Sequence, residues 1–255
     1  MTTAPQGTPC WYELTTTNLD GAQAFYSAVF GWAIAGAGMP GMDYRLATAG
    51  SDMVAGMWVP DMPGMPTFWM LYFTVSNCDA AAEAIAKAGG AVHKEPADIP
   101  GTGRFAEVAD PQGAAFGILQ PLDGNGNAFD QKQNGHGNWH ELMTADPKAA
   151  MAFYGAQFGW KASTSMDMGE MGSYDLFSHQ GADIGGMMRL SPNMPGPGTP
   201  FWLPYFGTDG IDAAAARVKG AGGQIVNGPM EVPGGAFIIV CKDPQGAMFA
   251  QVGPK

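Results

Sequence analysis

Two glutamates, Glu13 and Glu141, are the side chains whose type and position could do chemistry in both halves of this chain. Each follows a tryptophan, Trp11 or Trp139, by two residues, and alternate residues of a strand share one face. On an apolar face a carboxylate could act as a general base or as a hydrogen-bond acceptor, because exclusion of water makes it readier to take up a proton. The alternative is a structural role, in which the glutamate pairs with an arginine or with backbone amides. Repetition in both halves favours this structural role.

The sequence around the glutamates is duplicated. Residues 11–32 match residues 139–160 in the pairs Trp11/Trp139, Glu13/Glu141, Leu14/Leu142, Phe25/Phe153, Tyr26/Tyr154, Phe30/Phe158, Gly31/Gly159 and Trp32/Trp160. Further matches are Phe68-Trp69/Phe201-Trp202, Tyr72-Phe73/Tyr205-Phe206, Gly89-Gly90/Gly222-Gly223 and the DPQG segments at 110–113 and 243–246. A repeat of this density predicts two tandem domains. We expect domain 1 at residues 1–122 with a loose arm at residues 1–9, a polar linker at residues 123–135, and domain 2 at residues 136–255.

The hydrophobic pattern predicts two βαβββ modules in each half. In the first module, a strand over residues 11–16 precedes a helix that Asp20 caps and Gly31 ends, because apolar residues recur there at helical spacing. The helix of the second module is expected to begin at Asn77 or Asp79 and to end before Gly89. The other strands of the first half are expected between residues 32 and 38 and at 44–48, 52–59, 68–75, 93–97, 104–108 and 115–119.

The composition excludes several classes of partner. The formal net charge is −11, and both nucleic acids and anionic membranes require a basic face. No apolar run reaches the ~18 residues of a membrane span, and the first ten residues lack a signal-peptide pattern. The separated cysteines Cys10, Cys78 and Cys241 indicate reduced thiols. We expect a cytoplasmic protein, a monomer with two packed domains or a homodimer, that binds a small molecule, no nucleic acid and no membrane.

Three features together resemble a known superfamily. They are the strand and AFY…FGW helix that open each half, the helices that end in AGG, and the DPQG turn before each last strand. This combination resembles the glyoxalase / bleomycin-resistance / extradiol-dioxygenase superfamily, also called vicinal oxygen chelate proteins. The tandem WxEL openings resemble its two-domain bacterial members, which are labelled glyoxalase-like or hydroxylase. The resemblance implies an α+β fold with two tandem domains, each of two βαβββ modules that form a curved open sheet around a cavity.

The resemblance also implies a divalent metal inside each sheet, held by His, Gln or Glu side chains. The corresponding positions here are Trp11 and Trp139, positions at or beside Met70 and Leu203, Gly117 and Ala250, and positions near Gly56 and Gly186. None of these residues can bind a metal as His, Gln or Glu does. We therefore expect no metal cofactor. A shift of one residue on two strands would bring in His140 and Gln251, so the alternative is one divalent metal near His140.

Several further side chains are candidates for binding a ligand in the implied cavity. Besides the catalytic candidates Glu13 and Glu141, they are Trp11, Trp139, His140, Trp69, Trp202, Met57, Met187 and Arg189. Tryptophans could stack on a flat ligand or pack the core, and methionines could line a pliable apolar pocket or reflect only the composition. Arg45, Arg104 and Arg189 could pair with a glutamate or an acidic ligand, or lie exposed at strand edges.

Three functions remain open from the sequence. The first is a metal-independent protein that binds a small apolar or aromatic molecule, either as a resistance-type binding protein or as an enzyme with Glu13 or Glu141 as acid/base. The second is a metal-dependent glyoxalase-type lyase or dioxygenase with an atypical site. The third is a non-catalytic scaffold with vestigial pockets. If the chain is an enzyme, the resemblance implies lyase, isomerase or oxygenase chemistry with a glutamate acid/base.

Overall fold

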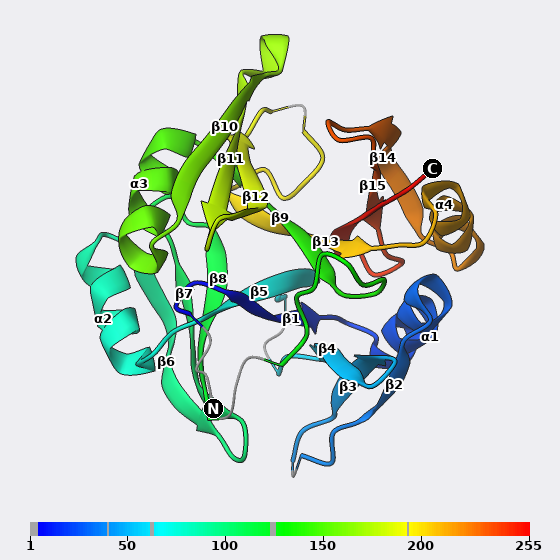
Figure 1. Ribbon diagram of the computed structural model, residues 1–255. Helices are drawn as coiled ribbons and strands as arrows, with labels where there is room; N and C mark the ends of the chain where they lie inside the picture. Colours follow the sequence, from blue (N-terminus) through cyan, green and yellow to red (C-terminus); the bar gives the residue numbers. More distant parts are fainter. Residues whose placement is uncertain (1–4, 40, 62–63, 123–125, 193) are drawn as a thin grey trace. The chain divides into compact units, whose positions relative to one another are not determined.

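The fold is α+β, as the sequence predicts (Figure 1). The computed structural model describes residues 5–39, 41–61, 64–122, 126–192 and 194–255. Within these ranges the chain forms two eight-stranded mixed sheets and four α-helices. Each sheet belongs to one repeat, and the order of its strands is the same in both.

The sheet of the first repeat has the order β2-β3-β4-β1-β5-β8-β7-β6. Its strands are β1 (Pro9–Thr15), β2 (Ala33–Gly36), β3 (Tyr44–Ala49), β4 (Asp52–Trp58), β5 (Phe68–Thr74), β6 (Ala91–Ile99), β7 (Gly103–Ala109) and β8 (Ala115–Pro121). The sheet of the second repeat has the order β10-β11-β12-β9-β13-β16-β15-β14. Its strands are β9 (Gly137–Thr144), β10 (Lys161–Asp167), β11 (Ser173–His179), β12 (Ala182–Arg189), β13 (Phe201–Gly207), β14 (Gln224–Glu231), β15 (Phe237–Lys242) and β16 (Met248–Gly253).

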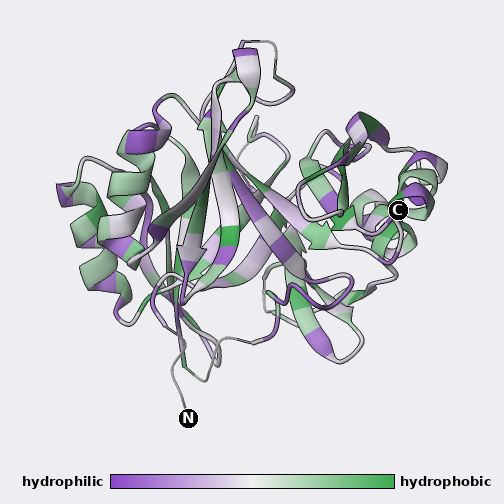
Figure 2. Cartoon of the chain, turned by 45° about the horizontal axis from the view of Figure 1, so that its top comes forward, coloured by the Kyte–Doolittle hydropathy of each residue, from purple (hydrophilic) through white to green (hydrophobic). Residues whose placement is uncertain are grey.

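One helix follows the first strand of each module. The helices are α1 (Leu19–Phe30), α2 (Cys78–Lys87), α3 (Pro147–Phe158) and α4 (Ile211–Gly220), and in Figure 2 each carries both apolar and polar residues. Gly31 ends α1, as predicted, and Gly159 ends α3 in the same way; both adopt the left-handed conformation. The predicted cap Asp20 is wrong: Asn18 accepts the hydrogen bond from the Gly21 amide, so the helix begins two residues earlier than predicted.

The chain packs as two compact units, and each unit combines one module from each repeat. The first unit comprises the described residues of Met1–Cys10, Leu71–Asn125 and His140–Trp202, and α2 contacts α3 in it. The second unit comprises those of Trp11–Met70, Gly126–Trp139 and Leu203–Lys255, and α1 contacts α4 in it. Of the predicted linker, residues 126–135 belong to the second unit, and residues 123–125 lie outside the described residues.

The residues shared by the two repeats form a buried hydrogen-bonded chain in each unit. In the second unit, Trp69 Nε1 donates to Tyr26 Oη at 2.9 Å, and Tyr26 Oη donates to Asp243 Oδ2 at 2.9 Å. In the first unit the same chain joins Trp202, Tyr154 and Asp110, with distances of 3.0 and 3.1 Å. These repeated residues therefore belong to the framework of the fold. Each series of hydrogen bonds links a tyrosine of one repeat to an aspartate of the other.

The segment expected to be a loose arm is anchored in its described part. The Gly7 amide donates to the Thr74 carbonyl, and the Gly7 carbonyl accepts from Trp160 Nε1 at 2.9 Å. Residues 1–4 lie outside the described residues. The three cysteines are buried free thiols, in agreement with the expected reduced state. No described helix is both long enough and apolar enough to cross a membrane.

Candidate functional site

Glu13 lies at the centre of a group of aromatic side chains in the second compact unit. Tyr44 Oη donates to Glu13 Oε2 at 2.7 Å, and Trp58 Nε1 donates to Glu13 Oε1 at 3.2 Å. Trp11 Nε1 in turn donates to Tyr44 Oη at 3.2 Å. We call Trp11, Glu13, Tyr44 and Trp58 the Glu13 cluster. All four side chains are half-buried, so the cluster keeps contact with solvent.

Three neighbouring strands place the Glu13 cluster on one face. Strand β4 lies between β3 and β1, and Gly56 of β4 is in register with Glu13 of β1. Tyr44 of β3 must therefore cross β4 to reach Glu13, and it crosses at Gly56. A Cβ atom at position 56 would lie only 1.8 Å from Tyr44 Oη. The absence of a side chain at Gly56 is what allows the hydrogen bond between Tyr44 and Glu13.

The electrostatics of the cluster keep Tyr44 as a donor. Burial raises the pKa of Tyr44 well above its ordinary value, and the charge of Glu13 and the hydrogen bond to it raise this pKa further. The phenol therefore stays protonated at neutral pH and holds the Glu13 carboxylate in place. The two indole rings and the phenol form walls beside this carboxylate. Such an arrangement can receive a hydrogen-bond donor at the carboxylate and an aromatic ring against the walls.

The second copy keeps part of this arrangement in the first compact unit. Glu141 of β9 is in register with Gly186 of β12, and a Cβ atom at Gly186 would lie 2.3 Å from the ring of Tyr174. The position equivalent to Trp58 is Met188, which is buried. Glu141 itself is only 8% exposed. The glutamate, tyrosine and glycine are thus shared by both copies, whereas the second indole is specific to the Glu13 cluster.

At His140, the residue proposed for an alternative metal site, the structure has a buried, neutral imidazole. His140 is fully buried on β9, and its Nδ1 donates to the Ile184 carbonyl at 2.8 Å. Burial lowers the pKa of His140 to about 4. Gln251 belongs to the other compact unit, where it is fully buried on β16. Neither polar atom of its side chain has a hydrogen-bond partner within the described part of the chain.

The residues at the implied metal positions do not fit a divalent metal. Gly56 and Gly186 are covered by the rings of Tyr44 and Tyr174, and a Cβ atom at Gly117 would lie 2.1 Å from the ring of Tyr72. A ligand side chain has no room at any of these three glycines. The other implied positions are Trp11, Trp139, Met70, Leu203 and Ala250, whose side chains offer no oxygen or imidazole ligand. The described residues contain no group of three His, Cys, Asp or Glu side chains that could hold a metal ion.

The remaining predicted ligand-binding residues take no part in the hydrogen bonds given above for the Glu13 cluster. Trp69 and Trp202 are buried donors of the two framework chains. Met57 and Met187 are buried on β4 and β12, where each pairs in register with Leu14 or Leu142. Arg189 is exposed at the end of β12, and Trp139 is half-buried on β9.

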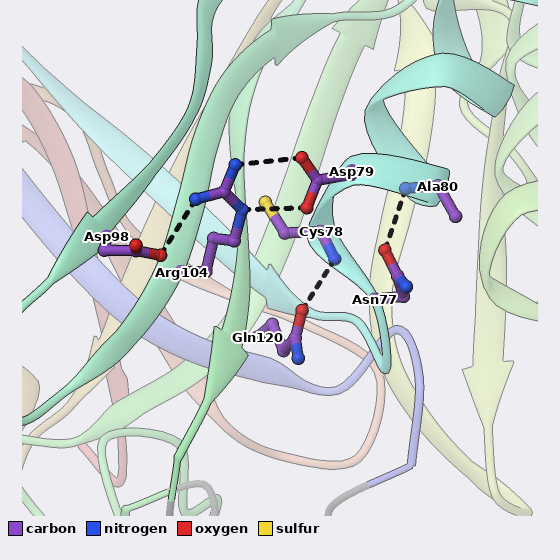
Figure 3. Close-up of polar contacts among 7 residues, drawn as sticks. All are labelled: Asn77, Cys78, Asp79, Ala80, Asp98, Arg104 and Gln120. Atoms are coloured by element: carbon purple, nitrogen blue, oxygen red, sulfur yellow. Dashed lines mark hydrogen bonds and ion pairs between the residues drawn. The ribbon is translucent and has the colours of Figure 1, made fainter.

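The arginines of the first repeat pair with helix residues. Arg104 of β7 donates through Nε and Nη2 to Asp79 at 2.8 and 2.9 Å, and through Nη1 to Asp98 at 2.8 Å (Figure 3). Asp79 lies in the first turn of α2. Arg45 likewise donates to Asp20 in the first turn of α1 and to Gln23, both at 2.6 Å. Both arginines therefore stabilise helix starts.

Tyr44 and Gly56 are residues of the candidate site whose packing the sequence interpretation missed. A usable signal existed, because the spacing from Tyr44 to Gly56 recurs from Tyr174 to Gly186 in the second repeat. A tyrosine matched with a glycine on the neighbouring strand of a hairpin indicates a ring that crosses the backbone.

Filling the space at Gly56 tests this packing. Gly56→Ala should lower the free energy of unfolding by about 2 kcal/mol, because the new methyl group displaces the Tyr44 ring. Urea unfolding followed by circular dichroism measures the change. The matched control is Gly36→Ala on β2, where an added Cβ atom meets nothing within 4 Å. Equal effects of the two substitutions would contradict the crossing of Tyr44 over β4.

Comparison with known proteins identifies the family. The family model of the Glyoxalase/Bleomycin resistance protein/Dioxygenase superfamily matches residues 10–118 and 137–250. CFP32, a candidate glyoxylase of Mycobacterium tuberculosis (strain CDC 1551 / Oshkosh), is 36% identical over 254 residues, which cover 98% of this chain and 95% of that protein. The anthracycline biosynthesis protein DauV of Streptomyces sp. (strain C5) is 30% identical over 273 residues, which cover 99% of this chain and 95% of that protein.

The solved structures agree at the level of the fold. The 2,3-dioxygenase LapB from Pseudomonas sp. KL28 matches with a TM-score of 0.69 at 14% identity, over 98% of this chain and 93% of that chain. At this identity the likeness shows the fold alone. The family match over both repeats and the relatives of similar length confirm the predicted resemblance. The chain belongs to the Glyoxalase/Bleomycin resistance protein/Dioxygenase superfamily.

Proposed function

We propose that this protein binds a small apolar or aromatic molecule at the Glu13 cluster without a metal ion. The observation that carries the proposal is the half-buried Glu13 carboxylate, which Tyr44 and Trp58 hold between aromatic rings. Aromatic walls favour a flat apolar body, and the carboxylate accepts a hydrogen bond from a donor at its edge. The relative named for anthracycline biosynthesis supports the same class of ligand, because an anthracycline contains flat fused aromatic rings.

We place the working site at Glu13, and Glu141 is the second candidate. The two copies share the glutamate, the tyrosine and the glycine, but only the first has an indole at position 58. Glu141 is also more enclosed, with 8% exposure. If the bound molecule is transformed, Glu13 is the acid/base residue, since it lies next to the donor that it recognises. The substitution of position 58 therefore distinguishes binding at the two copies.

Titration calorimetry with 2-naphthol tests the proposal. The naphthyl ring supplies the flat apolar body and the hydroxyl group supplies the donor. Wild-type protein should bind one molecule, and Trp58→Met should weaken the affinity about tenfold, because a stacking surface and a hydrogen bond to Glu13 are lost together. Methionine is the residue of the second repeat at this position, Met188, so the variant copies a side chain that the fold accepts.

The control and the contradicting outcome follow from the duplication. Met188→Leu changes the equivalent buried position in the other copy without touching Glu13, and it should leave the affinity for 2-naphthol unchanged. Absence of binding to the wild-type protein would remove the proposal. If Met188→Leu weakens the binding of 2-naphthol and Trp58→Met does not, the binding site lies at the Glu141 copy.

A further inference from the structure

The hydrogen-bond donors of the Glu13 cluster are engaged inside the cluster. A tryptophan side chain has one proton to donate, on Nε1, and a tyrosine side chain has one, on Oη. Trp11 Nε1 donates to Tyr44 Oη, which itself donates to Glu13 Oε2. Trp58 Nε1 donates to Glu13 Oε1. Each of the three protons is thus used, and the oxygen atoms that the cluster presents to a ligand can only accept.

The direction of each hydrogen bond is fixed by the groups themselves. An indole N–H can only donate, and an ionised carboxylate can only accept. Burial and then the charge of Glu13 raise the pKa of Tyr44 well above its ordinary value, so the phenol keeps its proton at neutral pH. The ring of Tyr44 also lies directly over Gly56, which fixes the position of Oη. The donors of the cluster therefore do not turn around to meet an acceptor on a ligand.

The charged donor of the three strands lies on another face. Strands β1, β3 and β4 contain a single arginine, Arg45, and no lysine. Arg45 follows Tyr44 directly, so its side chain lies on the opposite face of β3. Its guanidinium donates to Asp20 and Gln23 of α1. The peptide N–H groups of the strands point along the sheet toward neighbouring strands, so they do not add donors to this face.

A ligand on this face meets acceptor oxygens and the faces of aromatic rings. A hydroxyl group finds a partner there, whereas a carbonyl oxygen would lose its hydrogen bonds to water and face lone pairs. Resting on the proposed function, we infer that the Glu13 cluster selects the hydroxylated form of an aromatic molecule and rejects the carbonyl form of the same skeleton. Tyr44 determines this specificity, because its only proton is donated to Glu13 and none is left for the ligand.

A matched alcohol and ketone test the polarity of the cluster. 1-(2-Naphthyl)ethanol and 2-acetylnaphthalene have the same skeleton, but only the alcohol can donate a hydrogen bond. In titration calorimetry the wild-type protein should bind the alcohol about tenfold more tightly than the ketone. Glu13→Gln should bind the ketone about fivefold more tightly than the wild type does, because the glutamine amide brings protons that the carboxylate lacks. Glu83→Gln, which removes an exposed carboxylate from α2, should keep the affinities of the wild type.

Tyr44→Phe is a second variant that leaves Glu13 in place. It removes the oxygen to which Trp11 Nε1 donates, so the indole proton becomes available to the ketone. The preference for the alcohol should therefore fall to about twofold or less. Tyr174→Phe changes the equivalent tyrosine of the second repeat, and it should keep the preference of the wild type. Near-ultraviolet circular dichroism checks that each variant is folded.

The outcomes separate this inference from the proposed function. Equal affinities for the alcohol and the ketone in the wild-type protein, both weakened by Trp58→Met, would overturn the inference and leave the proposed function intact. A preference for the alcohol that persists in folded Glu13→Gln and Tyr44→Phe variants would also overturn the inference, because other groups would then set the polarity. Absence of binding by both probes would overturn the proposed function as well.

Discussion

Tyr26→Phe is expected to lower the free energy of unfolding by about 3 kcal/mol. The substitution removes one hydroxyl group and keeps the ring in place. That hydroxyl accepts from Trp69 Nε1 and donates to Asp243, so its loss leaves two buried polar groups without their partner. Burial raises the pKa of Asp243, and the hydrogen bond from Tyr26 opposes this rise. Urea unfolding followed by near-ultraviolet circular dichroism measures the loss.

The second repeat and a double variant supply the controls for this result. Tyr154→Phe breaks the equivalent chain between Trp202 and Asp110, and it should cost a similar free energy. Trp69→Phe combined with Tyr26→Phe should cost less than the sum of the single substitutions, because both remove the same hydrogen bond. Additive costs would show that Trp69 and Tyr26 do not act as one chain.

The framework residues explain why the fold could be predicted from one sequence. Tyr26, Trp69 and Asp243 belong to the AFY, FW and DPQG segments that recur between the halves. The hydrogen bonds among these three side chains require each residue type, so a substitution at any of them lowers the stability of the fold. The repeat therefore stays recognisable in the sequence. The pairing itself could not be predicted. Tyr26 reaches an aspartate of the other repeat, and the order of residues along the chain gives no sign of which copy it contacts.

The candidate site was predicted in part. Glu13 and Trp11 stand out because the duplication repeats them. The contact of Tyr44 with Glu13 depends on the register between β3 and β4. That register contains an irregularity between Ala47 and Thr48, so counting residues back from the hairpin turn misplaces every later pair by one. Local propensity carries no information on such a shift.

Helix starts show the same limit on a smaller scale. Asp20 and Asn18 are both good capping residues, and their spacing to the apolar positions does not separate them. In the structure Asn18 caps the helix, and the Asp20 carboxylate accepts from Arg45 of a distant strand at 2.6 Å. The local sequence alone does not fix this boundary.

His140 should make stability depend on pH, with a loss of about 3 kcal/mol as the pH falls from about 6.5 to about 4. Burial lowers the pKa of His140 from 6.5 to about 4 in the folded protein. Within this window the unfolded chain binds a proton and the folded chain does not, so acid favours unfolding. Above the window both states are neutral and His140 contributes no dependence on pH.

The difference between two variants isolates this contribution from other titrating groups. His140→Asn retains an amide that can donate to the Ile184 carbonyl in place of Nδ1, and it removes the titration. The wild-type protein should therefore lose about 3 kcal/mol more than His140→Asn between pH 6.5 and pH 4, measured by urea unfolding at each pH. Part of the carboxylate titration occurs in the same range, but it is common to both proteins and cancels. His93→Asn, at an exposed position of β6, should follow the wild-type profile. A constant difference between wild type and His140→Asn across this range would mean that water reaches the imidazole, which would contradict the enclosed position of His140 on β9.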